Sequence, residues 1–237
     1  MFSIIAHDLK SPFSAILGFT NLLKDKIRSL DIEKSEKLIT SMNSQARRTY
    51  NLLEDLLSWG RNKIGKMGYD PTFCNISTIC EEVIELVKDT AQMKNITLNN
   101  FHPENANVYA DKNMVLTVLR NLISNAIKFT ETNGKIEVHS TLNDEYVKIS
   151  VSDNGIGVDE EHKVNLFNLD LNNTKLGTAN EKGTGFGLAI CKDFIERHHG
   201  EIWFEDNPIK GSIFKFTLPI YKEQDHRTRN KILNQKT

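Results

Sequence analysis

The sequence predicts an α+β fold in two parts, a helical hairpin followed by an α/β sandwich of helices on a mixed sheet. Two long stretches near the start of the chain carry apolar residues at helical spacing and are joined by a short connection. Beyond a segment rich in glycine and charge, strand-like and helix-like patterns alternate. We assign residues 1–60 to the hairpin, 61–71 to a linker, 72–221 to the second domain and 222–237 to a charged tail that we expect to be disordered.

The hairpin consists of one predicted helix over residues 2–29 and a second from about Ser35 to Trp59. Their apolar stripes are formed by Phe2, Ile5, Leu9, Phe13, Ile16, Leu23 and Ile27, and by Leu38, Met42, Leu52, Leu53 and Leu56. Helices of roughly 40 Å each cannot bury stripes of this width against each other alone. We therefore favour a second copy of the hairpin as the cover, which gives a dimeric four-helix bundle. The alternative is that the hairpin packs on the rest of its own chain.

Periodicity also orders the elements of the second domain. Helical spacing predicts helices over 77–94, 111–129 and 185–199. Alternation of apolar and polar residues predicts strands over 72–76, 96–101, 135–142, 146–151, 201–205 and 213–218.

The composition excludes several classes of protein. Of the 237 residues 39% are hydrophobic, which is enough to build a core. The 30 Lys and Arg balance 31 Asp and Glu, so the chain lacks the basic excess of a nucleic-acid binder. The three cysteines have unrelated spacings, which argues against a disulfide framework or a cysteine-based zinc site and fits a reducing compartment. No apolar run of about 18 residues exists, so we expect no membrane contact from this chain.

Polar side chains follow one face of the helix predicted at 111–129. Asn121, Asn125 and Lys128 lie there at positions i, i+4 and i+7. An amide oxygen suits a hard cation such as Mg²⁺, and a lysine suits phosphate. A solvated polar helix face has the same pattern, so this helix alone does not define a site.

A second candidate follows the strand at 146–151, where the chain reads Asp153-Asn154-Gly155-Ile156-Gly157. Glycines at alternate positions permit positive φ angles and close approach of a ligand. A buried carboxylate at a strand end can accept a hydrogen bond from an exocyclic amine. The same residues also form ordinary hairpin turns, so this signal too is weak by itself.

Glycines also open the last predicted helix, in Gly183-Thr184-Gly185-Phe186-Gly187-Leu188. Backbone N–H groups of glycines before a helix N-terminus can cradle phosphate. The spacing is that of neither a Rossmann fingerprint nor a Walker A motif. The stretch between Gly157 and Gly183 is rich in Asn, Thr, Gly and Lys, and a loop of this length is typical of a lid or of disorder.

The fourth candidate is the run His7-Asp8-Leu9-Lys10-Ser11-Pro12 in the first predicted helix. In order and spacing, the four segments together resemble a sensor histidine kinase of two-component signalling. The matching segments are 7–12 for the phosphoacceptor H box, 121–130 (NLISNAIKFT) for the N box, 153–157 for the G1 box, Phe167 for the F box and 183–188 for the G2 box. The run 173–188 (NTKLGTANEKGTGFGL) is similar to the ATP lid of this family, and the resemblance extends to about residue 220.

The resemblance implies a dimerisation and histidine-phosphotransfer hairpin, followed by an ATP-binding domain of the Bergerat type. His7 would be the phosphoacceptor with Asp8 as its orienting base, and an aspartate of a response regulator would then receive the phosphoryl group. Asp153 would accept a hydrogen bond from the adenine amine, and Asn125 would hold Mg²⁺. The other ATP-binding residues that the resemblance implies are Asn121, Lys128, Gly155, Gly157, Thr174, Lys175, Gly183, Thr184, Gly185, Gly187 and Leu188.

Two other functions use the same fold. Topoisomerase, mismatch-repair and chaperone ATPases of this fold carry a water-activating glutamate four residues before the metal-binding asparagine. Here that position is Asn121, whose amide cannot act as a general base, and this favours a kinase. A non-catalytic pseudokinase that serves as a dimeric scaffold is disfavoured because every box is intact.

Three features of the sequence depart from the family pattern. Ser11 stands four residues after His7, where this class usually has Thr or Asn to orient a hydrolytic water, so we expect weak phosphatase activity. His199 stands where a second glycine is common. The first helix starts only six residues before His7, whereas family members usually have more helix, a linker and a sensor upstream, often with membrane spans. We therefore expect this chain to be the cytoplasmic portion of a larger sensor protein.

Overall fold

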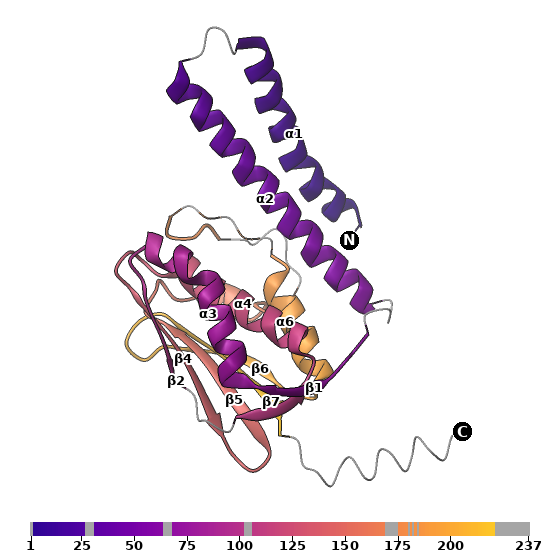
Figure 1. Ribbon diagram of the computed structural model, residues 1–237, viewed down its shortest axis with the longest axis vertical. Helices are drawn as coiled ribbons and strands as arrows, with labels where there is room; N and C mark the ends of the chain where they lie inside the picture. The colour runs from indigo at the N-terminus through magenta and orange to yellow at the C-terminus, as the bar shows by residue number, and fades with distance from the viewer. Residues whose placement is uncertain are drawn as a thin grey trace, which may run out of the picture. The chain divides into compact units, whose positions relative to one another are not determined.

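The computed structural model describes residues 2–26, 31–63, 68–101, 106–168, 175–179, 181, 183 and 185–220. This part of the chain forms two compact units, one helical and one of α+β architecture (Figure 1). The predicted α+β fold class is confirmed.

The helical unit is an antiparallel hairpin of α1 (Phe2–Lys26) and α2 (Ile32–Lys63), which pack side by side (Figure 1). α2 begins earlier than its periodicity predicts because Asp31 caps it. The backbone N–H of Lys34 donates to Asp31 Oδ1 at 2.7 Å. At its other end α2 continues through Gly60 to Lys63, into the stretch expected as linker. One glycine inside a helix costs only about 1 kcal/mol, which the adjoining turns can offset.

Large apolar side chains of the hairpin remain exposed in a single chain. The exposed ones are Phe13, Leu17 and Leu22 of α1 and Ile32, Ile39, Tyr50 and Leu53 of α2. Burying one side chain of this kind stabilises by about 1.5–3 kcal/mol, so a covering surface would contribute substantially. This exposure agrees with the prediction that the hairpin needs a covering surface, for which a second copy of the hairpin and the rest of the same chain are the two candidates.

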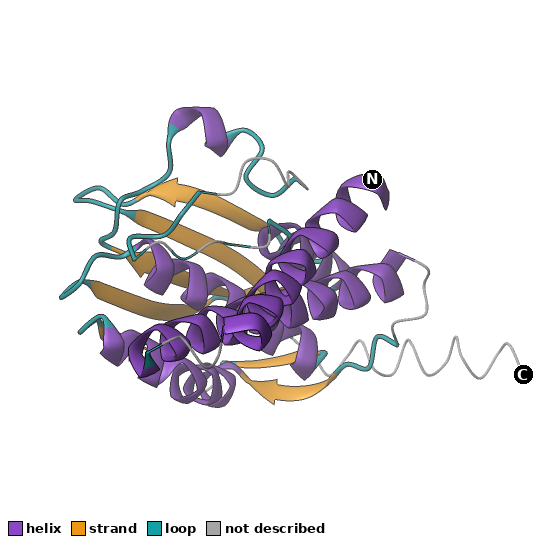
Figure 2. Ribbon diagram, turned by 90° about the horizontal axis from the view of Figure 1, so that it is seen from above, coloured by secondary structure: helices purple, strands orange, loops and turns teal. Residues whose placement is uncertain are grey.

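The α+β unit is built on a mixed sheet, whose strands are orange in Figure 2. The strand order is β2-β4-β5-β7-β6. Its strands are β2 (Thr97–Phe101), β4 (Lys135–Leu142), β5 (Tyr146–Asp153), β6 (Ile202–Asp206) and β7 (Ser212–Pro219). β2 pairs with β4 in parallel, and the remaining neighbours pair antiparallel. Along β5 and β7 buried residues alternate with partly exposed ones, so one face of the sheet lies on the core.

A second, smaller sheet pairs β1 (Thr72–Asn75) with β3 (Asn107–Ala110) in antiparallel register. The sequence predicts β1 but not β3. A strand of 4 residues is too short for an alternating pattern to stand out from a loop.

The helices α3 (Ile76–Met93), α4 (Lys112–Phe129) and α6 (Gly187–Arg197) pack on the sheet, with α4 between the other two. The buried residues of α4 are Met114, Val115, Val118, Leu119, Leu122, Ile123, Ala126 and Ile127. α6 begins at Gly187 rather than at the predicted position 185, because Gly185 has a φ of 79°, which a helix does not allow. The short helix α5 (Glu160–Lys163) is not predicted by the sequence.

The N-terminus of α4 joins the first residues of the α+β unit to its last helix. Asp111 caps α4 through Oδ1, which accepts from the N–H groups of Asn113 and Met114 at 3.0 and 3.1 Å. Its Oδ2 accepts from the N–H of Asp70 at 3.1 Å, and its own N–H donates to His198 Nε2 at 2.9 Å. Burial lowers the pKa of His198, so the ring is neutral at pH 7 and can accept this bond.

The three cysteines lie in the core of the α+β unit. Cys74, Cys80 and Cys191 are buried and form no disulfide, and burial raises the pKa of the Cys80 thiol to about 12. They therefore serve as small core residues.

None of the described helices is both long enough and apolar enough to cross a membrane.

α6 ends in a Schellman motif that places a histidine in the left-handed conformation. The N–H of Gly200 donates to Ile195 O and the N–H of His199 donates to Glu196 O, both at 3.0 Å. His199 has a φ of 59°, where a Cβ atom costs about 1–2 kcal/mol. The departure from glycine at this position therefore has a cost in stability.

We predict that His199→Gly raises the free energy of unfolding by about 1 kcal/mol, because glycine adopts this conformation without the Cβ penalty. Urea denaturation of the whole chain measures the change. His199→Ala keeps the Cβ atom and serves as the control, which should gain little. Gly200→Ala should destabilise, because a Cβ there would overlap the carbonyl oxygen of Thr217. A His199→Gly variant no more stable than His199→Ala would contradict the strain argument.

Candidate functional site

Asn121 lies on the half-buried polar face of α4 and directly against the start of α6. A Cβ atom on Gly187 would lie 2.8 Å from Asn121 Oδ1, so glycine is needed for this close approach. The Nδ2 of Asn121 is buried and has no hydrogen-bond partner among the described residues. An unpaired buried donor costs about 1–3 kcal/mol. Because it lies beside a helix N-terminus, where negative charge is favoured, this donor fits an anionic ligand.

Asp153 ends β5 with a carboxyl group that is almost completely buried, its exposure being 3%. Its Oδ1 accepts from the N–H of Gly155 at 2.8 Å and from the N–H of Ser212 at 3.2 Å. Burial raises the pKa of Asp153 to about 6, although these two hydrogen bonds act to lower it. At neutral pH the group is therefore ionised, and its Oδ2, which has no partner among the described residues, can accept from an amine.

Two glycines allow backbone segments to approach Asp153 closely. A Cβ atom on Gly155 would overlap the carbonyl oxygen of Phe129, at the end of α4. A Cβ atom on Gly211, whose φ is 101°, would lie 2.7 Å from Asp153 Oδ1. The N–H of Ile156 also donates to Phe129 O at 3.1 Å. The turn after β5 is therefore fastened to the C-terminal end of α4.

Two lysines meet at the described part of the predicted lid. Lys128 Nζ donates to the carbonyl oxygen of Lys175 at 3.0 Å and lies 4.5 Å from the centroid of the Phe129 ring. The Lys175 ammonium pairs with Asp159, and its side chain is 38% exposed. An exposed ion pair of this kind contributes little free energy, so Lys175 can exchange Asp159 for another anionic partner at little cost.

The structure brings together three pairs of predicted site residues: Asn121 with Gly187, Asp153 with Gly155, and Lys128 with Lys175. Gly157 and Gly185 have φ angles of 73° and 79°, which explains the use of glycine at both positions. Asn125 and Leu188 are partly exposed on α4 and α6, and Gly183 is partly exposed in the lid.

Other predicted site residues cannot be placed. Thr174 and Thr184 lie outside the described residues. His7, Asp8 and Ser11 lie in α1, but the structure does not describe their side chains. Phe167, at the predicted F box, makes an edge-to-face contact with Phe214 on β7, with ring centroids 6.3 Å apart.

Sequence reasoning missed the residues that hold Asp153 from the β6–β7 turn, which are Asn207, Gly211 and Ser212. Asn207 Nδ2 donates to the carbonyl oxygen of Asp153 at 2.9 Å, and the N–H of Ser212 donates to the carboxyl group. The available signal was the Gly-Ser pair immediately before the last predicted strand. By itself that pair indicates only a turn.

Fold and site together define a nucleotide-binding α+β domain preceded by a helical hairpin. Residues 1–63 match the family model of the His Kinase A (phospho-acceptor) domain. Residues 110–222 match the model of the histidine kinase-, DNA gyrase B-, and HSP90-like ATPases, so the α+β unit is an ATP-binding domain. The chain belongs to the sensor histidine kinases, and the predicted family is confirmed.

Two curated relatives are adaptive-response sensory kinases SasA. The protein from Synechocystis sp. is 31% identical over 229 residues, and the protein from Microcystis aeruginosa is 30% identical over 228 residues. Each match covers 93% of this chain and 58% of the relative. The chain thus spans less than two thirds of the length of these relatives.

Solved structures of the histidine kinase ThkA are similar to this chain. The ThkA catalytic domain is 34% identical, and the match covers 63% of this chain and 95% of that domain with a TM-score of 0.56. A structure of ThkA in complex with the response regulator protein TrrA is 28% identical and has a TM-score of 0.74. That match covers 93% of this chain and 61% of ThkA.

We predict that Asp153→Asn stabilises the folded chain at pH 7.5 while it abolishes nucleotide binding. The pKa of this carboxyl group is raised from 3.8 to about 6, so above pH 6 its ionised form costs the folded state about 3 kcal/mol. The folded state binds the proton more tightly than the unfolded chain does. Wild-type stability should therefore rise as the pH falls from 6 towards 3.8, and the advantage of the variant should shrink over the same window.

Urea denaturation at several pH values between 4 and 8 measures this difference. Asp144→Asn, in the exposed turn between β4 and β5, is the control for the loss of one negative charge. A stability difference between wild type and Asp153→Asn that does not change with pH would show that the carboxyl group is not the cause.

Proposed function

We propose that this chain transfers the γ-phosphoryl group of ATP to His7 and then to an aspartate of a response regulator. The observation that carries the proposal is the presence in one chain of a phosphoacceptor hairpin, with His7 in α1, and an ATP-binding domain built around Asp153. The partner is supported by ThkA, a similar kinase whose structure was solved with the response regulator TrrA.

In this proposal the nucleotide lies between the polar face of α4 and the lid. Asp153 accepts a hydrogen bond from the adenine amine through Oδ2, which selects adenine over guanine because guanine offers a carbonyl at that position. The unpaired Nδ2 of Asn121 and the ammonium of Lys128 bind phosphate oxygens. The other residues proposed to bind ATP are Gly155, Gly157, Thr174, Lys175, Gly183, Thr184, Gly185, Gly187 and Leu188.

We further propose that Asn125 holds Mg²⁺. Its amide oxygen is of the type that this cation prefers, and it lies one helical turn from Asn121. Among the described residues no group of three or more His, Cys, Asp or Glu side chains could hold a metal ion. A Mg²⁺ site with one amide ligand fits the usual coordination by substrate phosphates and water. The cation would neutralise charge on the phosphates.

The chemistry at His7 requires a neutral ring with a free lone pair. The ring nitrogen attacks the γ-phosphorus in line, an N–P bond forms, and the bond from phosphorus to the β,γ-bridging oxygen breaks with its electrons leaving on ADP. Asp8 accepts a hydrogen bond from the other ring nitrogen, which favours the tautomer whose lone pair can attack. In the transfer to the regulator, a carboxylate oxygen is the nucleophile that attacks the phosphorus. An O–P bond forms, and the N–P bond breaks with its electrons returning to the His7 ring.

A second copy of the chain is the proposed cover for the hairpin. The exposed apolar residues on α1 and α2 supply a surface that a symmetric partner can bury. The match to the phosphoacceptor family over residues 1–63 supports a homodimer. The resulting four-helix bundle is the surface on which the response regulator would dock.

We predict that His7→Gln abolishes autophosphorylation and leaves ATP affinity within about twofold, because His7 is in the hairpin and the nucleotide is held by the α+β unit. Incubation with γ-labelled ATP and Mg²⁺ measures labelling, and calorimetry measures affinity. His139→Gln is the matched control, since His139 is a partly exposed ring stacked on Phe101 of β2 and is not part of any predicted box.

The chemical stability of the label gives an independent check on this prediction. A phosphohistidine is labile in acid and stable in alkali, so the wild-type label should show this behaviour. Labelling that persists in His7→Gln, or a label stable to acid, would identify another acceptor and refute the assignment of His7.

We also predict that Ser11→Thr raises the rate at which the chain dephosphorylates its regulator, with little change in autophosphorylation. A serine hydroxyl can orient the attacking water but lacks the γ-methyl group that restricts the threonine rotamer. A less well oriented water should react more slowly, by about tenfold for a modest loss of positioning. The measurement uses purified phosphorylated regulator. Equal dephosphorylation rates for the serine and threonine forms would refute the argument.

A further inference from the structure

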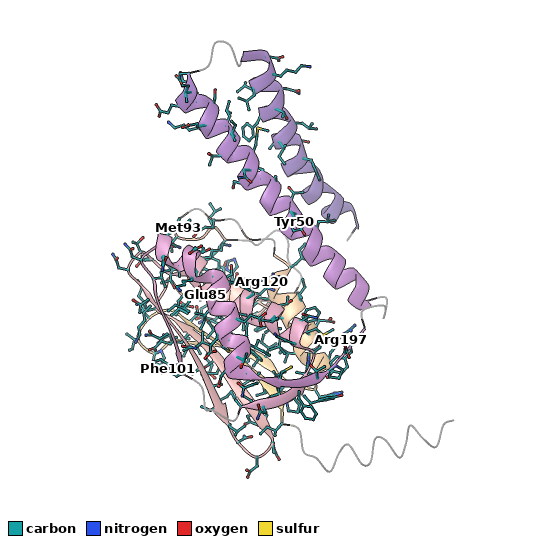
Figure 3. All side chains as sticks on the ribbon, in the orientation of Figure 1. Tyr50, Glu85, Met93, Phe101, Arg120 and Arg197 are labelled. Carbon is teal, nitrogen blue, oxygen red and sulfur yellow. The ribbon has the colours of Figure 1, made fainter. Side chains whose placement is uncertain are left out.

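Lys94 is a buried lysine directly after a solvent-exposed methionine. Met93, labelled in Figure 3 at the end of α3, is 86% exposed, whereas the next residue, Lys94, is 9% exposed. Hydrophobic residues are usually buried and lysines usually exposed, so this reversal needs a cause. A buried ammonium is stable only if its N–H groups are paired.

The ammonium of Lys94 lies among four oxygen atoms. Its Nζ donates to the carbonyl oxygens of Ile127 and Lys128, at 2.8 and 3.2 Å, which belong to the last turn of α4. A cation there is favoured by the helix dipole and satisfies carbonyls that have no partner within the helix. Nζ also lies 2.6 Å from Thr178 Oγ1 and 2.9 Å from Glu181 Oε1. The second pair of acceptors comes from the predicted lid.

These contacts fasten one part of the lid, which we call the lid base and define as residues 175–179 and Glu181. Within it, Glu181 Oε2 accepts from the N–H of Ala179 at 2.8 Å. Although burial acts to raise the pKa of Glu181, hydrogen bonds from Lys94 and from backbone N–H groups lower it overall. Glu181 therefore stays ionised as the counter-charge of Lys94.

The lid base also forms hydrogen bonds with the end of α4 through the backbone and the side chain of Thr178. The N–H of Thr178 donates to Lys128 O at 3.0 Å, and Thr178 Oγ1 donates to Thr130 O at 2.8 Å. A Cβ atom on Gly177 would lie 2.5 Å from Lys128 Cγ, which is too close for two carbon atoms. The lid base can therefore pass this near to Lys128 only because residue 177 is glycine. Lys128 thus has its carbonyl bound by Lys94 and Thr178 and its ammonium directed to Lys175 O.

We infer that Lys94 is a positioning residue for the triphosphate: by tying the lid base to the end of α4, it holds Lys128 and Lys175 where they can reach phosphate. The inference rests on the proposed function, which gives these two lysines their role. The adenine side does not depend on Lys94, because Asp153 is held by Gly155, Ser212 and Asn207. Loss of Lys94 should therefore weaken phosphate binding and leave adenine binding intact.

Lys94→Met keeps an unbranched side chain of nearly the same length and removes the charge. It should lower the affinity for MgATP and the autophosphorylation rate at saturating ATP, each by about tenfold or more, the usual effect of losing a hydrogen bond to a charged group. The affinity for AMP, which lacks the β- and γ-phosphates, should stay within about twofold. Calorimetry with MgATP and NMR titration with AMP give the two affinities.

Lys88→Met is the matched control, since Lys88 is an exposed lysine of the same helix in an ion pair with Glu85. It should leave all three quantities unchanged. Glu181→Ala provides a second variant whose side chain is at the surface, should Lys94→Met fail to fold. It should show the same selective loss of MgATP affinity, and the double variant should lose no more than Lys94→Met alone.

Equal losses of AMP and MgATP affinity in Lys94→Met would show a general structural role and overturn the inference. Wild-type MgATP affinity in both Lys94→Met and Glu181→Ala would overturn it as well. A wild-type chain that binds MgATP but does not label His7 would refute the proposed function instead. In that case the comparison of AMP with MgATP still tests the role of Lys94, so the two failures can be told apart.

Discussion

The carboxyl group of Asp153 must stay charged inside a protein core, and the architecture of the ATP-binding domain follows largely from that requirement. Burial raises its pKa, so the ion needs donors, and the N–H groups of Gly155 and Ser212 supply them. These donors can come close only if Gly155 and Gly211 lack a Cβ atom. One buried charge thereby joins the end of β5, the β6–β7 turn and, through Phe129, the end of α4.

The two sides of the site are held by different kinds of interaction. The proposed adenine side, around Asp153, is fixed by backbone N–H groups and glycines within closely packed turns, which leaves little freedom to move. Besides the backbone hydrogen bond from Thr178 to Lys128, the lid base is held mainly by the side chains of Lys94 and Glu181, and the Glu181 side chain is 35% exposed. Water can compete for such contacts, so they open at lower cost. A rigid site around Asp153 beside a more easily released lid suits the proposed kinase, which must bind ATP, deliver its γ-phosphoryl group and release ADP.

Sequence reasoning succeeds where a pattern is long or where the partners are neighbours in the chain. The periodic apolar face of α4 fixes which residues point away from the core, so the spacing of Asn121, Asn125 and Lys128 is enough to group them on one face. Asp153 and Gly155 are two residues apart, and their contact follows from the turn itself. Ser212 and Lys94 reach the site from positions 59 and 87 residues away from their partners, Asp153 and Glu181. A single lysine at a helix end has the same pattern as a solvated one, so only the fold shows that Lys94 is buried.

The free domain carries two costs at the proposed nucleotide site. Asn121 Nδ2 is buried without a partner among the described residues, and burial of the ionised carboxyl group of Asp153 raises its pKa to about 6. Each cost is removed by the group that the site is proposed to bind, a phosphate oxygen in one case and the adenine amine in the other. The protein is thus less stable than a domain with satisfied polar groups would be, and binding recovers the difference. Because both groups are fixed by backbone packing before the ligand arrives, little of the recovered free energy is spent on ordering them, and it remains available for affinity.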